Sequence, residues 1–201
     1  MSRPSARMVT HDHDVPGDKA MWVFIFAELV TFLLFFLVFA WLERGDPAGF
    51  AAGRSDLHPG LGLLNTLVLL TGGALALAGV RRLEADGAQN GRAAGQWFSA
   101  AAITGLAFSA VKLTEFAGLF AQGRHLSSST FHFFYFFLCF IHLAHVWLGM
   151  ALLLWARRRA GRERPAAERL SAWQAAAAYW HMVDLVWLVL FPLVYLGGGR
   201  P

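Results

Sequence analysis

A chain of 201 residues that is 57% hydrophobic, 14% aromatic and only 15% charged is too apolar for a soluble domain of its size. Its net charge of +4 does not indicate a nucleic-acid partner, because the basic residues alternate along the chain with long apolar stretches. Five such stretches approach or exceed the ~20 residues that a ~30 Å hydrocarbon core requires. The sequence therefore predicts an all-α membrane protein with five spans, over residues 21–42, 61–80, 96–120, 131–155 and 173–196.

The basic residues also predict how the chain is oriented. Twelve of the seventeen Lys and Arg residues fall on the side that holds the N-terminus, in the segments 3–19, 81–92 and 157–169. The opposite side holds Arg44, Arg54, Arg124 and Arg200. By the positive-inside rule we expect a cytoplasmic N-terminus, a periplasmic C-terminus and basic loops in contact with anionic phospholipid.

Residues 1–20 form a predicted cytoplasmic arm, followed by a single five-helix transmembrane domain over residues 21–197. The arm contains His11-Asp12-His13-Asp14, for which a solvated polar segment is favoured over a metal site. The first predicted helix has one ionisable residue, Glu28, about 10 Å below the cytoplasmic edge. An isolated carboxyl there is expected to be neutral.

Several interpretations of Glu28 stay open. It can bond to Thr31 or another helix, contact a partner or a lipid headgroup, or share a proton with His142, His145 or His181. The polar connection after the first helix, residues 43–60, shows no recognisable chemistry. In the second helix, Gly72-Gly73 predicts close approach of a neighbouring helix.

The third and fourth helices carry the other unusual polar residues. Lys112 and Glu115 are three residues apart, and a self-neutralised ion pair is favoured over a role in ion passage. Alternating spacings of three and four place His132, Tyr135, Cys139 and His142 on one stripe, with His145 beside it. The single Cys139 excludes an intramolecular disulfide.

A metal site built from His142, His145, His181 and Glu28 is one interpretation of these residues. The chain lacks the repeated Glu-x-x-His motif of di-iron carboxylate proteins. Hydrogen bonding between helices is therefore favoured, and we expect no metal site and no catalytic residue.

The last helix contains His181 and Asp184, three residues apart and so on one face. A polar pair at that depth is costly against lipid, so it is expected to face other helices or a partner. The sequence thus predicts two polar clusters. The first, proton- or lipid-associated, is Glu28, His142, His145, His181 and Asp184, and the second is Lys112, Glu115, His132 and Tyr135.

Five stretches, in order, resemble the cytochrome c oxidase subunit III family. They are the helix around Glu28, L-L-N-T at 63–66, K-L-T-E at 112–115, F-I-H-L-A-H-V-W-L-G at 140–149 and Y-W-H-M-V-D-L-V-W at 179–187. Residues 127–137 depart from the oxidase form and look more like the subunit III homologues that accompany bacterial nitric oxide reductases.

The resemblance implies an antiparallel bundle equivalent to the last five helices of the family's seven-helix form. It implies a non-catalytic subunit in a bacterial plasma membrane that binds no cofactor itself, with haem and metal in its partner. That partner is the catalytic subunit of a haem-copper oxidase or nitric oxide reductase, and the chain holds lipid and supports proton uptake and stability.

Two alternatives of other classes come from the residues alone. An independent small transporter or proton channel would use the polar groups as a relay, but the two clusters show no connection. A stand-alone metal-dependent membrane enzyme is disfavoured by the number of candidate ligands.

Overall fold

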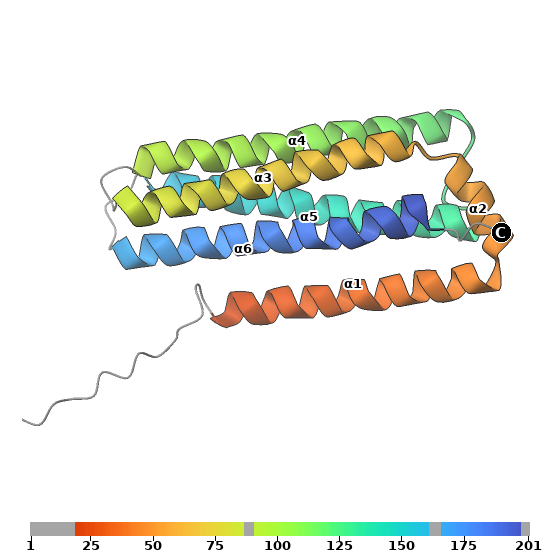
Figure 1. Cartoon of the computed structure of the whole chain (residues 1–201), viewed down its shortest axis with the longest axis horizontal. Coiled ribbons are helices and arrows are strands. Elements are labelled where there is room, and N and C mark those ends of the chain that lie inside the picture. The colour runs from red at the N-terminus through yellow and green to blue at the C-terminus, as the bar shows by residue number, and fades with distance from the viewer. Residues whose placement is uncertain (1–18, 87–90, 161–165, 198–201) are drawn as a thin grey trace, which may run out of the picture.

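A computed structural model describes residues 19–86, 91–160 and 166–197 of the chain. This part contains six α-helices and a final π-helical turn, η2 (Figure 1). The predicted arm, with His11 to Asp14, lies outside the described residues. The elements are α1 (Lys19–Gly45), α2 (Pro47–Ser55), α3 (Pro59–Asp86), α4 (Gly91–Ala121), α5 (Thr130–Ala160), α6 (Ala166–Phe191) and η2 (Pro192–Leu196).

The prediction of five membrane spans is confirmed. The helices in this part of the chain that are long and apolar enough to cross a membrane are Ala20–Gly45, Pro59–Ala85, Ala93–Ala121, Thr130–Arg158 and Ala172–Leu196.

The predicted loops at 81–95 and 157–169 were too long, because residues 81–86, 91–95, 157–160 and 166–169 are helical. Hydropathy marks the part of a helix within hydrocarbon, whereas backbone hydrogen bonding continues into the polar interface. Arg81 and Arg82 therefore belong to α3 rather than to a loop.

Successive long helices run antiparallel, so that the start of α1 and the start of α6 lie at one end of the molecule (Figure 1). Helices α3, α4, α5 and α6 form a closed four-helix bundle, each packed against the next and α6 against α3. Helix α1 lies outside this bundle, alongside α6 (Figure 1). Many of its large apolar side chains are exposed, as expected for a helix that faces lipid or another protein.

The centre of the bundle is built around Trp180 of α6, which has no solvent exposure. Glycines from the three other bundle helices meet its ring: Gly72 in α3, Gly105 in α4 and Gly149 in α5. A Cβ atom added to any of them would lie 2.8 to 3.1 Å from that ring. Close helix approach at Gly72 was predicted from the sequence, and the structure identifies the large side chain that requires it.

The connection between the first two spans is not the featureless loop that the sequence predicted. It contains α2, with Pro47 in its first turn and with the Asp46 carboxylate accepting a hydrogen bond from the Gly49 amide at 2.9 Å. Pro47 and this cap start the helix. It was not predicted, because the segment is too short and glycine-rich to show a clear hydrophobic periodicity.

Arg54 makes α2 a link between three segments. Its guanidinium lies 2.7 Å from the Glu43 carboxylate at the end of α1. It also donates to the carbonyl oxygens of Leu193 and Val194, at 3.0 and 3.1 Å. Carbonyls in the last turn of a helix lack partners within the helix, and a basic side chain can satisfy them. Arg54 therefore joins α1 to the C-terminal end of the bundle.

Candidate functional site

Lys112 and Glu115 form the expected ion pair within the bundle, with 2.7 Å between Nζ and Oε2. The Lys112 side chain has no solvent exposure. The Tyr195 hydroxyl completes the site, because it donates to Glu115 Oε2 at 2.7 Å and accepts a hydrogen bond from Lys112 Nζ. Tyr195 lies 80 residues beyond Glu115, so spacing along one helix could not identify it.

Aromatic rings surround the Lys112 ammonium group. Its Nζ atom lies 4.9 Å from the ring centre of Trp187, 5.0 Å from that of Tyr195 and 5.6 Å from that of Tyr135. Ring faces attract cations, and this attraction grows when water is excluded. The predicted cluster member Tyr135 thus lies against Lys112, and the surroundings compensate part of the cost of burying a charge.

His132, the fourth predicted member of this cluster, belongs to a different group near the end of the bundle. Its Nδ1 atom lies 2.8 Å from the Ser129 hydroxyl, and its Nε2 atom lies 3.2 Å from Asp56 Oδ2. Asp56 also forms an ion pair with Arg124 at 3.0 Å. Asp56 was not predicted, because the connection 43–60 shows no recognisable chemistry in the sequence alone. The second predicted cluster is therefore two separate sites.

Glu28 of α1 contacts His145 of α5, with 3.1 Å between Oε2 and Nε2. The other ring nitrogen of His145, Nδ1, lies 2.8 Å from the Ile141 carbonyl oxygen, which can only accept. Nδ1 therefore carries a proton. The hydrogen bond to Glu28 then requires one more proton, either on the carboxyl or on Nε2. Glu28 and His145 form a pair that shares one transferable proton.

The Thr31 hydroxyl, the other partner considered for Glu28, donates to the Ala27 carbonyl of its own helix at 2.9 Å. His142 does not join the Glu28 pair. Its fully buried ring packs against Phe108 and Trp187, with centroid distances of 5.5 and 5.2 Å. Neither ring nitrogen has a hydrogen-bond partner among the residues that the structure describes. The predicted hydrogen bonding between helices is therefore wrong for His142, because aromatic side chains occupy the neighbouring positions.

His181 and Asp184 share a face of α6, but their environments differ. The Asp184 side chain is 5% exposed. It packs against Gly73, where an added Cβ atom would lie 2.2 Å from Asp184 Oδ2. The His181 side chain is 44% exposed, and its Nδ1 atom is 3.8 Å from Asp184 Oδ2. This distance allows charge attraction but exceeds that of a hydrogen bond. The first predicted cluster thus separates into three sites.

Within residues 19–86, 91–160 and 166–197, no group of three or more His, Cys, Asp and Glu side chains is placed to hold a metal ion. The chemistry available at these sites is ion pairing, hydrogen bonding and the holding of a proton.

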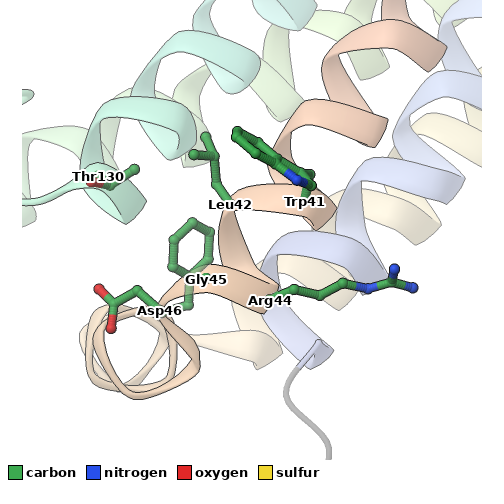
Figure 2. A pocket seen from close by; sticks show the side chains of 7 residues that line it. Trp41, Leu42, Arg44, Gly45, Asp46 and Thr130 are labelled. Atoms are coloured by element: carbon green, nitrogen blue, oxygen red, sulfur yellow. The ribbon is translucent and has the colours of Figure 1, made fainter.

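An open pocket of about 610 Å³ lies where the C-terminal end of α1 meets α2 and the start of α5. Trp41, Leu42 and Thr130 line part of it (Figure 2). Arg44 extends away from Asp46 in this view, and Asp46 is already used to cap α2 (Figure 2). The pocket therefore has no converging polar groups comparable to those at Lys112, Asp56, Glu28 and Asp184.

Residues 6–199 match the family model described as cytochrome c oxidase subunit III. The cytochrome bo(3) ubiquinol oxidase subunit 3 of Pseudomonas aeruginosa is 28% identical, over 96% of this chain and 94% of the relative. The cytochrome c oxidase subunit 3 of Thermostichus vulcanus is 26% identical, over 97% and 95%. A protein of Aeropyrum pernix named heme-copper oxidase subunit I+III is 32% identical, over 90% of this chain and 23% of its own length. The chain therefore belongs to the cytochrome c oxidase subunit III family, whose members are subunits of haem-copper oxidases.

Proposed function

We propose that this chain packs on the catalytic subunit of its oxidase in a bacterial plasma membrane, holds phospholipid there and supports proton uptake and stability during turnover. The family match over residues 6–199 carries this proposal. The relative named subunit I+III adds support, because it joins a segment similar to this chain to a subunit I in one polypeptide. Haem and metal are then bound by the catalytic subunit.

The Glu28 and His145 pair is the site that fits a role in proton uptake. It holds a transferable proton between α1 and α5, and both side chains are partly exposed rather than closed off. The Lys112 site does not fit as well, since its ammonium group, carboxylate and tyrosine hydroxyl satisfy one another within the bundle. We assign the Lys112 site a structural role within the bundle.

The proton role is tested by following the activity of the complex during sustained turnover. Glu28→Leu, which cannot hold a proton, is expected to shorten the active lifetime of the enzyme without changing its initial haem content. Thr31→Val is the matched control, because Thr31 lies one turn further along α1 and bonds only to Ala27 of its own helix. Equal lifetimes for Glu28→Leu and wild type would leave Glu28 with a packing role alone.

The identity of the electron acceptor is a separate question. The relatives named above are oxidase subunits, which favours an oxygen reductase as the partner. Residues 127–137 favour the alternative of a nitric oxide reductase, because they look more like the subunit III homologues that accompany such enzymes. Measuring oxygen and nitric oxide consumption by the purified complex distinguishes the two. Family membership favours a subunit of either kind over an independent transporter or proton channel.

A further inference from the structure

His181 is a polar side chain exposed on an apolar surface of the membrane-spanning region. It lies nine residues into the span Ala172–Leu196, or about 14 Å along α6 at 1.5 Å per residue. Its side chain is 44% exposed. The next residues on this side of α6, Leu185 and Leu188, are 51% and 43% exposed. Lipid tails offer no hydrogen-bonding group at this depth, so an exposed imidazole there is costly unless another molecule supplies one.

The surroundings of the ring define which atom is available. The edge bearing Nδ1 and Cε1 faces α3, because both atoms lie 3.2 Å from the place of a Cβ on Gly73. Nδ1 also faces Asp184 Oδ2 at 3.8 Å, and an acceptor oxygen on this side favours a proton on Nδ1. Nε2, the ring nitrogen on the other side of Cε1, makes no hydrogen bond to any described residue. With the proton on Nδ1, Nε2 carries a lone pair that can accept a hydrogen bond, and the side chain as a whole is 44% exposed.

Asp184 gives a second, independent indication of a polar function at this place. Its Oδ1 atom is buried and has no hydrogen-bond partner within the described part of the chain. Gly73 makes room for the carboxylate beside α3. A buried carboxylate is expensive to keep where it serves only packing, but it fixes the orientation and the proton position of a neighbouring imidazole.

We propose that the face of α6 formed by His181, Leu185 and Leu188 is the surface that binds the catalytic subunit. Its occupant is a transmembrane helix of that subunit carrying a hydrogen-bond donor, such as a hydroxyl, amide or indole N–H, opposite His181 Nε2. This inference rests on the proposed function and names the surface that serves it. Helix α6 runs between α3 and α1 (Figure 1) and packs against both. The partner helix would lie along the exposed face of α6.

Site-specific photo-crosslinking within the assembled complex tests the surface. A benzophenone amino acid at Leu185 or Leu188 is expected to crosslink to the catalytic subunit. The matched controls are Ile103 and Leu106, which are 62% and 60% exposed on α4, a helix whose main neighbours are α3 and α5. Crosslinks to the catalytic subunit from α4 alone, or only lipid adducts from α6, overturn the inference but leave the proposed function standing. Failure of the two subunits to purify together overturns both.

Substitution of His181 tests the hydrogen bond itself. His181→Leu is expected to weaken binding of the catalytic subunit by roughly 3- to 20-fold, the range of hydrogen bonds between membrane helices. His181→Gln, whose side-chain carbonyl also accepts a hydrogen bond, should restore much of the binding. The thermal stability of the chain alone should be unchanged in both variants, because the His181 ring makes no hydrogen bond within the described chain. Equal binding by the Leu and Gln variants would overturn the proposed contact.

Discussion

Lys112 shows how a full charge is accommodated inside a membrane protein. The cation is balanced by Glu115, hydrogen-bonded to Tyr195 and surrounded by three aromatic rings. Such a site is not a strong source of stability, because removing two charges from water costs about as much as their attraction returns. Replacing only one partner of the ion pair is strongly destabilising, because it leaves an uncompensated charge inside the bundle.

Lys112→Met is therefore expected to destabilise the chain by about 3–5 kcal/mol, the cost of breaking a buried pair by removing one partner. Lys112→Met combined with Glu115→Gln should recover part of that loss, because no charge is then left alone. Thermal unfolding in detergent measures both variants, with Arg44→Met at the exposed end of α1 as control. A single variant as stable as wild type would contradict this description of the site.

The Glu28 pair gives a prediction about protonation. Since His145 Nδ1 already donates to Ile141, one further proton is held between the carboxyl and Nε2. We expect it on Glu28, because that arrangement leaves both side chains neutral and avoids two charges within the membrane. The infrared difference spectrum of wild type minus Glu28→Gln should show a protonated carboxyl band. A carboxylate band in its place would mean that His145 carries the charge.

Some of these contacts between residues could be predicted from the sequence, and others could not. The Lys112 and Glu115 pair was predictable, because a spacing of three fixes it within one helix. Tyr195 and Asp56 were not, because both reach their partners through tertiary contacts between segments far apart in the chain. Glu28, His142 and His181 were predicted in one cluster because they lie at similar depths in the membrane. In the structure they point to different neighbours.

At the scale of the helices, apolar length predicted the spans well, while α2 escaped notice because its start depends on Asp46 and Pro47 rather than on a hydrophobic period. Packing between helices depends on features that hydropathy does not measure. The fit of Trp180 against glycines of three neighbouring helices sets how closely those helices approach. This arrangement leaves no room for an added methyl group.

Gly72→Ala tests that packing. Its Cβ would lie 2.2 Å from the Thr104 hydroxyl and 3.1 Å from Trp180, so we expect a loss of about 1–3 kcal/mol from overpacking. Gly118→Ala on α4 is the control, because no atom lies within 4 Å of its added Cβ. There the substitution should be neutral or stabilise the helix by up to ~1 kcal/mol. Thermal unfolding that ranks the two variants in the opposite order would contradict the packing described.

For the whole molecule, five antiparallel spans place the two ends of the bundle on opposite sides of a membrane (Figure 1). The excess of basic residues predicts which side is cytoplasmic. A reporter inserted near Gly161 should be active in the cytoplasm, and one fused after Pro201 should be active in the periplasm. The inverse pattern, read from paired alkaline phosphatase and fluorescent protein fusions, would reverse the predicted orientation.

Affinity purification of the tagged chain from its native membranes tests whether this chain works as a subunit on a catalytic partner. We expect the chain to bring down a larger membrane subunit in constant ratio, together with a haem absorption spectrum and oxygen-reducing activity. Membranes that lack the catalytic subunit are the control and should yield the chain without haem. Recovery of the chain alone from native membranes, stable and free of any haem protein, would contradict the claim.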